Sequence, residues 1–257
     1  MSAVLETRGL HKSFGGLTVT RDVSLRIAPG ARHALIGPNG AGKTTLINQI
    51  TGVLQPSQGS IWLDGVNITR LPPDARVGRG LARTFQINTL FADLTPLEAV
   101  TNAICARKHR QLNILKRRFT RLSRRTAEID EAYALLERLN LSRDCFVLTR
   151  QLPYGKQRLL EMALALATKP KMLLLDEPAA GIPEGESDEL FAVLAQLPAD
   201  ISILLIEHDM NLVFNFADRI TVLVNGEELV TGPPAQIAVD PRVREVYLGK
   251  GHRVAEC

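Results

Sequence analysis

Aromatic residues are scarce in this sequence: they make up 5% of it, with one Trp, three Tyr and eight Phe. A core of ordinary size must therefore be built mostly from aliphatic side chains. Cysteine is scarce too. Cys105, Cys145 and Cys257 are odd in number and widely spaced, with neither the spacing of a zinc site nor the density of a disulfide framework. This pattern predicts a protein of a reducing compartment.

The sequence also lacks long apolar runs. None approaches the roughly 18–20 residues needed to cross a bilayer, and the N-terminus MSAVLETRGLHK has no apolar run of signal-peptide length. We therefore expect the protein to be made and kept in the cytoplasm. A length of 257 residues allows one large domain or one domain with an inserted subdomain. The fraction of charged residues, 23%, is ordinary for a folded protein.

Acidic residues are absent from one stretch, residues 107–125, which holds nine Lys and Arg residues. Without these nine charges, the net charge of +4 becomes −5 for the rest of the chain, so the positive charge is local. Three interpretations remain open for this basic run: a solvated surface, a face that meets a membrane protein or anionic lipid, and a nucleic-acid site. The third is the least favoured, because Phe119 is the only Phe, Tyr or Trp in the run, too few to stack on successive bases.

The stretch ALIGPNGAGKTT, residues 34–45, fits the phosphate-loop pattern of Gly, four free positions, Gly, Lys and Ser or Thr. Glycines let successive N–H groups turn inward around an anion. An apolar strand, 34–36, precedes the loop, and a helix is predicted from Thr45 onward, with its N-terminus toward the phosphates. The predicted nucleotide-binding residues here are Gly37, Pro38, Asn39, Gly40, Ala41, Gly42, Lys43, Thr44 and Thr45.

Strand-like alternation in residues 4–28 and a short strand at 60–63 indicate an antiparallel sheet beside this loop. Phe14 lies just before Gly15-Gly16. Two interpretations of Phe14 weigh equally: an aromatic that stacks on a nucleotide base, and a core residue of a small sheet. Residues 97–140 have a helical pattern, clearest at 128–139, where one face is apolar.

Two largely apolar runs, 171–175 and 201–206, predict buried parallel strands. The first ends at Asp176-Glu177 and the second at Glu207-His208-Asp209, with a helix predicted between them at 185–197. Charged residues at the carboxyl ends of parallel strands are typical of ligand sites in α/β proteins. A hairpin is predicted around Asn225-Gly226, followed by a helix at 241–248.

A phosphate loop with a downstream apolar strand that ends in Asp is typical of phosphate-loop NTPases. Lys43 then serves the outer phosphates, while Thr44 and Asp176 hold Mg²⁺. Glu177 is the candidate general base that polarises the attacking water. The alternative for an Asp-Glu pair after a strand is a helix N-cap, which does not account for the phosphate loop.

On these residues the chain resembles the ATP-binding subunit of an ABC transporter. Gln86 in Arg83-Thr84-Phe85-Gln86 matches the Q-loop, His208 matches the switch histidine, and Phe14 matches the adenine-stacking residue. The family's signature, Leu-Ser-Gly-Gly-Gln, belongs in the segment formed by Leu152, Pro153, Tyr154, Gly155, Lys156 and Gln157. The resemblance implies catalytic roles for Lys43, Gln86, Glu177 and His208. It also implies Mg²⁺ ligation by Thr44, Gln86 and Asp176.

The implied fold is α/β: a phosphate-loop NTPase core with a mostly parallel sheet, an antiparallel β subdomain and an inserted helical subdomain. We expect one ABC ATPase domain, with residues 1–86 and 151–257 forming the β subdomain and core and residues 87–150 the helical insert. The Tyr154-Gly155 signature, the DEPAAG stretch from Asp176 and the ending VREVYLG are similar to the first ATPase subunit of branched-chain amino acid importers.

That subgroup implies uptake of branched-chain amino acids or related small acids and amides, powered by ATP with Mg²⁺. It implies membrane permeases and a second ATPase subunit as partners, with a homodimer of the isolated chain as the alternative. A periplasmic binding protein would act indirectly, nucleic acid would not be a partner, and the subunit would lie on the cytoplasmic face of the inner membrane. A non-transport ABC ATPase acting on nucleic acid or ribosomes is the alternative function.

Two residues depart from the family pattern. Pro153 replaces the signature Ser, and Pro has neither a hydroxyl nor a backbone N–H. Pro183 stands where the segment after the second Walker motif, the D-loop, usually has Asp or Asn. Both segments act on the partner's ATP in this family. Our hypothesis is therefore an asymmetric dimer, in which this subunit binds ATP well and offers its partner a weakened signature.

Overall fold

The computed structural model describes residues 3–84, 90–111, 125–183 and 185–248. The chain forms two compact units, one of residues 1–76 with 199–257 and one of residues 77–198. The predicted helical insert at 87–150 stays a prediction in its bounds. Within the described ranges, no helix is both long and apolar enough to cross a membrane.

The first unit contains an antiparallel sheet with the order β2-β1-β5-β6, in which β3 also pairs with β1. Its strands are β1 (Leu5–Phe14), β2 (Leu17–Val23), β3 (Arg26–Ile27), β5 (Gln58–Leu63) and β6 (Val66–Asn67). The antiparallel pairing of these strands confirms the predicted antiparallel sheet.

The same unit also contains strands in the order β11-β10-β4-β9, where β10, β4 and β9 run parallel. Their bounds are β4 (Arg32–Ile36), β9 (Ser202–Ile206), β10 (Arg219–Val224) and β11 (Glu227–Gly232). Every residue of β9 is buried, as expected for a parallel strand covered on both faces. The hairpin between β10 and β11 turns at Asn225 and Gly226, both with positive φ, which confirms the predicted turn.

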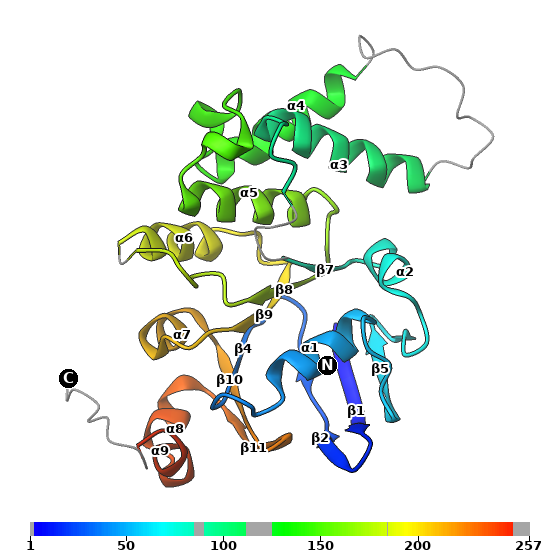
Figure 1. The fold of residues 1–257 in the computed structure, drawn as a ribbon, viewed down its shortest axis with the longest axis vertical. Coiled ribbons are helices and arrows are strands. Elements are labelled where there is room, and N and C mark those ends of the chain that lie inside the picture. Colours follow the sequence, from blue (N-terminus) through cyan, green and yellow to red (C-terminus); the bar gives the residue numbers. More distant parts are fainter. Residues whose placement is uncertain (1–2, 85–89, 112–124, 184, 249–257) are drawn as a thin grey trace. The chain divides into compact units, whose positions relative to one another are not determined.

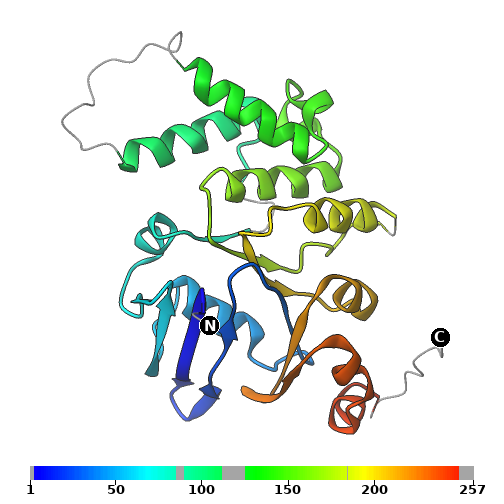
Figure 2. The ribbon, with the colours of Figure 1, turned by 180° about the vertical axis from the view of Figure 1, so that it is seen from behind.

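Helices of this unit cover the parallel strands. They are α1 (Lys43–Thr51), α7 (Met210–Phe216), α8 (Pro234–Val239) and α9 (Pro241–Leu248), while α2 (Pro73–Gly78) lies at the end of the unit's first segment. A cluster of Ile36, Val213, Val222 and Ile237 joins β4 and β10 to α7 and α8. The helices α8 and α9, in orange and red, lie together beside the β10–β11 hairpin in both views (Figures 1 and 2).

The second unit contains the parallel pair β7 (Leu81–Arg83) and β8 (Met172–Asp176), with Arg83 opposite Leu174. Its helices are α3 (Pro96–Gln111), α4 (Thr126–Arg138), α5 (Tyr154–Leu166) and α6 (Glu186–Ala195). Ala132 and Leu136, four residues apart on α4, are buried, which confirms the predicted apolar face.

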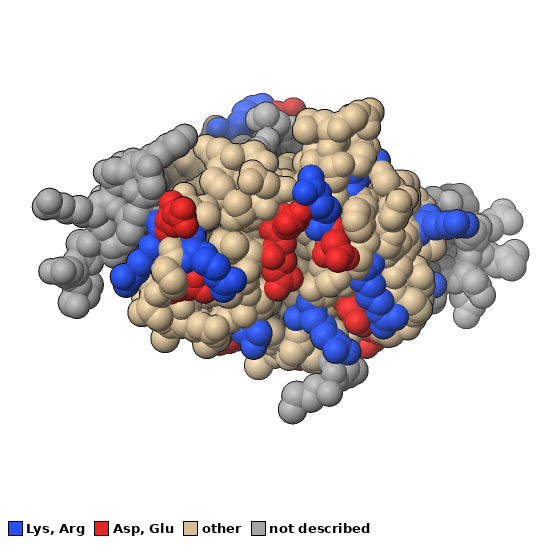
Figure 3. Space-filling model, turned by 90° about the horizontal axis from the view of Figure 1, so that it is seen from below, with Lys and Arg blue, Asp and Glu red and all other residues tan. Residues whose placement is uncertain are grey.

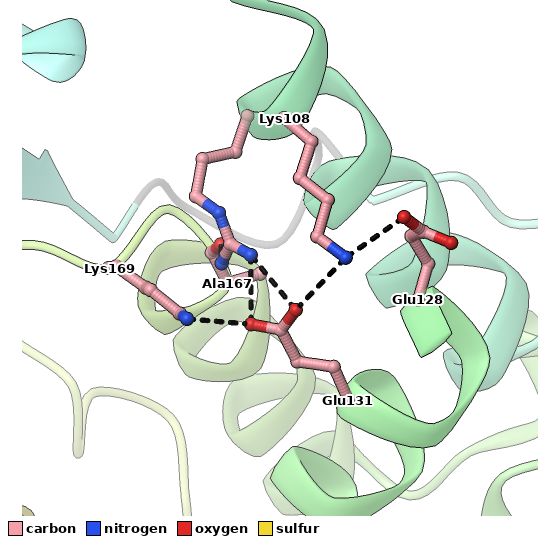
Figure 4. Close-up of polar contacts among 6 residues, drawn as sticks. Lys108, Glu128, Glu131, Ala167 and Lys169 are labelled. Atoms are coloured by element: carbon pink, nitrogen blue, oxygen red, sulfur yellow. Dashed lines mark hydrogen bonds and ion pairs between the residues drawn. The ribbon is translucent and has the colours of Figure 1, made fainter. Parts of the chain in front are cut away.

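The start of the basic run is engaged in ion pairs between α3 and α4 (Figure 4). Arg107 donates two hydrogen bonds to the Glu131 carboxylate, at 2.8 and 3.0 Å, and Lys108 lies 2.9 Å from Glu128. Burial alone would raise the pKa of Glu131, but the hydrogen bonds from Arg107 and Lys169 lower it overall. These contacts hold α3 against α4. Residues 112–124 lie outside the described residues.

Charges of both signs are interspersed on the face drawn in Figure 3. Among the described residues of that face, neither sign forms a continuous patch. A uniformly basic surface of the kind that binds nucleic acid is therefore not present there.

A buried histidine predicts acid sensitivity. His33 on β4 is 1% exposed, its Nε2 lies 2.8 Å from Thr221 Oγ1, and its pKa is lowered to about 4, chiefly by burial and also by Arg219. Between pH 6.5 and 4 the unfolded chain binds the proton and the folded chain does not, so stability falls as pH falls. We expect a loss of roughly 3 kcal/mol across this window.

This loss can be measured by urea unfolding at a series of pH values. A His33→Gln variant, which has no imidazole to titrate at this position, should lose roughly 3 kcal/mol less than the wild type between pH 6.5 and 4. Parallel pH dependences for the two proteins would show that His33 is not the cause.

Candidate nucleotide site

The phosphate loop connects β4 to α1, and its glycines have backbone requirements that other residues do not meet. Gly42 is the N-cap of α1 with φ 96°, and a Cβ there would lie 2.6 Å from the Val19 carbonyl oxygen. Gly40 also has a positive φ, of 80°. No side chain caps α1, and no acidic residue occupies its first turn. The positive end of the helix dipole is thus available to an anion.

Lys43, the first residue of α1, is held inside this loop. Its side chain is buried, with the residue 7% exposed, and Nζ donates to the carbonyl oxygens of Gly37 (2.6 Å) and Pro38 (3.1 Å). The ammonium is therefore oriented by the loop that carries the phosphate-facing N–H groups. Thr44, the next residue, is exposed. This is the arrangement expected for a phosphate site.

His208 follows β9, whose Ile206 pairs with Leu35 of β4. Because β4 and β9 are parallel neighbours, the phosphate loop and His208 leave the sheet at the same edge. His208 is exposed, and its backbone N–H donates to the buried Glu207 carboxylate at 3.0 Å. Asp209 is the N-cap of α7, where it accepts hydrogen bonds from the backbone of Asn211 and Leu212.

Phe14 ends β1 and is 51% exposed. Lys12 Nζ lies 5.1 Å from the centre of its ring. The interpretation of Phe14 as a core residue is therefore wrong. An exposed aromatic ring in the same unit as the phosphate loop is compatible with stacking on a base.

The second unit carries the acidic pair. Asp176 is the last residue of β8, and its Oδ2 accepts a hydrogen bond from Arg83 Nη2 of β7 at 2.6 Å. The side chains are 16% (Arg83) and 20% (Asp176) exposed. Sequence reasoning gave Arg83 no role. Arg83 ends β7, the strand that pairs with β8, and only this pairing shows that Arg83 lies close to Asp176.

Glu177 follows directly, with φ 49°, in the left-handed region that non-glycine residues rarely adopt. Such backbone conformations cost about 1–2 kcal/mol and cluster at functional sites. The turn is closed by a hydrogen bond from the Ala180 N–H to the Glu177 carbonyl.

The signature segment forms the start of α5. Leu152 is buried, Pro153 is the N-cap without a side-chain capping bond, and Tyr154 is the first helical residue. Gln157 Nε2 donates back to the Leu152 carbonyl at 2.9 Å. Lys156 Nζ bonds the Asn140 carbonyl and lies 3.3 Å from Asp144. Gln86 lies outside the described residues.

The donors assigned to Mg²⁺ suit that ion. The Thr44 hydroxyl and the Asp176 carboxylate are hard oxygen ligands, and Mg²⁺ binds through one or two such groups together with phosphates and water. Within the described ranges, no three His, Cys, Asp or Glu residues gather in a cluster able to hold a metal by themselves. A metal that arrives with nucleotide phosphates fits this donor set.

Comparison with known proteins identifies the family. The family described as "ABC transporter" matches residues 20–180, more than half of the chain. This chain is a member of the ABC transporter ATP-binding family. A second family, described as "Branched-chain amino acid ATP-binding cassette transporter", matches residues 228–253 of this ABC ATPase.

Relatives match this ABC ATPase over nearly its whole length. It is 42% identical over 255 residues to the high-affinity branched-chain amino acid transport ATP-binding protein BraF of Pseudomonas aeruginosa, covering 96% of this chain and 98% of the relative. It is 40% identical to LivG of Escherichia coli K12 at the same coverage. The crystal structure of the ADP conformation of MJ1267, an ATP-binding cassette of an ABC transporter, matches with a TM-score of 0.83 and 31% identity, covering 97% of this chain and all of that one.

The predicted fold class, family and ATPase activity are therefore confirmed. The protein is the ATP-hydrolysing subunit of an ABC transporter and works with membrane permease subunits. A non-transport ABC ATPase is not supported. The individual site residues stay predictions, because the comparisons assign the family and not the role of each side chain.

Proposed function

We propose that this ABC ATPase powers the uptake of branched-chain amino acids or of related small amino acids, organic acids and amides. The observation that carries the proposal is the match of residues 228–253 to branched-chain amino acid cassettes, at the C-terminal end where the ABC transporter match does not extend. Relatives at 40–42% identity, which carry the same cargo in their names, support it.

In the proposed mechanism, Phe14 stacks on the adenine, the phosphate-loop N–H groups and Lys43 bind the phosphates, and Gln86 senses them. Thr44, Gln86 and Asp176 would hold Mg²⁺, which supplies charge neutralisation on the phosphate oxygens.

Arg83 keeps the Asp176 carboxylate oriented through its 2.6 Å hydrogen bond. Glu177 accepts a proton from the attacking water, and His208 orients the γ-phosphate or the base.

The other half of the active site would come from a second, similar ATPase subunit, whose signature closes over ATP bound here. In this chain Pro153 provides no side-chain cap, and Pro183 is exposed. Because the proline ring has no polar group, neither residue offers a polar side chain across the dimer. This supports the asymmetric-dimer hypothesis, which predicts unequal turnover at the two sites. Equal turnover per site in the isolated chain and in the reconstituted pair would rule it out.

The remaining partners and the location follow from the proposed uptake. A periplasmic binding protein would select the cargo, and this subunit would sit peripherally on the cytoplasmic face of the inner membrane. The basic run 107–125 would contact the permease or the inner leaflet through residues beyond Arg107 and Lys108, whose charges are paired with α4.

Reconstitution tests the proposal. The chain would be purified with the permeases and second ATPase encoded beside it, placed in proteoliposomes with the neighbouring binding protein, and assayed for ATP-dependent uptake of labelled leucine, urea and a short amide. We expect uptake of at least one of these above the level of a Glu177→Gln complex. Uptake at the level of that inactive control for every cargo would refute the proposal.

The base-stacking role of Phe14 predicts a selective loss of nucleotide affinity. A Phe14→Ala variant should bind ATP roughly tenfold more weakly, because a base–aromatic stack contributes about 1–3 kcal/mol. Its affinity for tripolyphosphate, which has no base, should not change. Leu17→Ala is the matched control, since Leu17 is opposite Phe14 in the same hairpin and is 66% exposed. Equal losses for ATP and tripolyphosphate would contradict stacking.

A further inference from the structure

The start of α5 and the turn after β8 are joined by side chains that the proposed mechanism does not use. Tyr154 Oη donates to the Ala180 carbonyl at 3.2 Å. Arg158 Nη2 donates both to Tyr154 Oη, at 3.1 Å, and to the same carbonyl, at 3.4 Å. The Arg158 guanidinium also lies 5.3 Å from the centre of the Tyr154 ring. Two side chains of the signature helix thus converge on one backbone oxygen.

The Tyr154–Ala180 hydrogen bond is exposed, but the Arg158 side of the joint is buried. The Arg158 side chain is 9% exposed and the Glu161 side chain 4% exposed, and Arg158 Nη1 donates to Glu161 Oε2 at 3.0 Å. Glu161, one turn along α5, therefore holds the guanidinium aimed at the turn. A buried, charge-assisted network of this kind holds its members in one geometry, since breaking it leaves a buried charge unpaired.

The turn itself is shaped to receive Tyr154. Gly181 has φ 77°, and a Cβ there would lie 3.2 Å from Tyr154 Oη. The turn is closed by hydrogen bonds from the Ala180 N–H to the Glu177 carbonyl and from the Ile182 N–H to the Ala179 carbonyl, both 3.1 Å. Any residue larger than glycine at position 181 would therefore press on the tyrosine hydroxyl.

We propose that Tyr154 and Arg158 are positioning residues that lock the signature segment and the D-loop turn of this chain into one body. The inference rests on the proposed function, in which both segments act on the partner's ATP. Because Pro153 and Pro183 stand where the family has polar side chains, these segments have mainly backbone groups to present across the dimer. Backbone groups have no rotamers with which to adjust, so their fixed position decides whether they meet the phosphates.

Hydrogen exchange of the isolated chain tests the joint directly. A Tyr154→Phe variant keeps the ring and removes the hydroxyl. We expect the amides of Ala180 and Ile182 to exchange roughly tenfold faster. A tenfold change corresponds to a loss of about 1.4 kcal/mol in the free energy of local opening, which is the net contribution of one hydrogen bond. Tyr133→Phe is the matched control: Tyr133 on α4 is 43% exposed against 40% for Tyr154, and its hydroxyl bonds no other described residue. Unchanged exchange at residues 179–182 in Tyr154→Phe would overturn the proposal.

The consequence in trans is tested with the second ATPase subunit encoded beside this chain, by sedimentation of that subunit with the Glu177→Gln chain in the presence of ATP. Tyr154→Phe should weaken association roughly tenfold and leave the ATP affinity of the monomer within about twofold. An equal loss in both would mean a general structural role and would overturn the proposal. Arg158→Lys, which keeps a charge beside Glu161 but lacks the guanidinium fork, should behave as Tyr154→Phe does. If the Glu177→Gln chain and the second subunit do not associate in the presence of ATP, the proposed trans site fails, while the exchange measurement still decides the joint.

Discussion

Replacing Glu177 with glutamine should lower ATP turnover by about 10²–10⁴-fold, the usual contribution of a general base, while ATP remains bound. The amide keeps the size of the side chain and can still donate and accept hydrogen bonds, but it cannot take the proton of the attacking water. Because hydrolysis normally ends the closed state, the variant should also accumulate ATP-bound dimer.

The substitution of Glu177 by glutamine should not change the backbone conformation. Its φ of 49° would strain most residues, but glutamine has the same backbone preferences as glutamate, so the strain does not change. We expect the free energy of unfolding to stay within about 0.5 kcal/mol of the wild type. Loss of turnover can then be attributed to the carboxylate.

The measurement combines steady-state phosphate release with binding of a fluorescent ATP analogue. Glu189→Gln is a matched control, since Glu189 is an exposed glutamate of α6 in the same unit. It should retain wild-type turnover. Normal turnover in Glu177→Gln would refute the assignment of the base, and loss of ATP binding in that variant would point to a structural role for this carboxylate.

Replacing Arg76 with methionine should destabilise the protein by roughly 3–5 kcal/mol, an effect typical of breaking a buried polar network. Arg76 is 1% exposed and its guanidinium donates to four backbone carbonyls: Leu71 at 2.9 Å, Gln49 at 2.7 Å, Ile50 at 2.6 Å and Thr69 at 2.7 Å. Burial lowers its pKa to about 10, so it stays charged at neutral pH.

Two of these acceptors, Gln49 and Ile50, lie in the last turn of α1, so Arg76 caps the negative end of the helix that begins in the phosphate loop. The cap depends on Gly52, where a Cβ would lie 2.7 Å from Arg76 Nε. Methionine fills the space but leaves all four carbonyls without this donor. ATP affinity should fall along with stability, because α1 carries Lys43 and Thr44.

Urea unfolding of Arg76→Met and of Arg70→Met tests this. Arg70 is an exposed arginine a few residues earlier, and its substitution should change the unfolding free energy by less than about 0.5 kcal/mol. An Arg76→Met protein as stable as Arg70→Met would mean that solvent, and not Arg76, satisfies these carbonyls.

The sequence alone was sufficient for features set by local chemistry. The phosphate loop was predictable because its glycines adopt positive φ and its Lys and Thr follow at fixed spacing. The parallel strand β9 was predictable because four of its five residues are apolar, and the β10–β11 turn because Asn225-Gly226 suits a two-residue hairpin. In each case the cause lies within a few residues of its effect.

The contacts that set the geometry of the site were not predictable in this way. Arg83 and Asp176 are 93 residues apart, Arg76 and Gln49 27 residues apart, and Tyr154 and Ala180 26 residues apart. Nothing in the local pattern around Arg83 distinguishes it from a surface arginine. The equal weighting of the two interpretations of Phe14 failed for the same reason, since the exposure of a strand residue depends on what packs over it.

The sequence by itself thus determined which chemistry this protein carries: a phosphate loop, a candidate base and a signature segment that lacks its serine. Only the tertiary structure decided how these groups are held, with Arg83 on Asp176, Arg76 beneath α1, and Tyr154 and Arg158 on the Ala180 carbonyl. The physical reason is that backbone conformation and hydrophobic pattern are local properties of the chain. The partner of a buried charge or hydroxyl is chosen by the fold, from residues far away in the sequence.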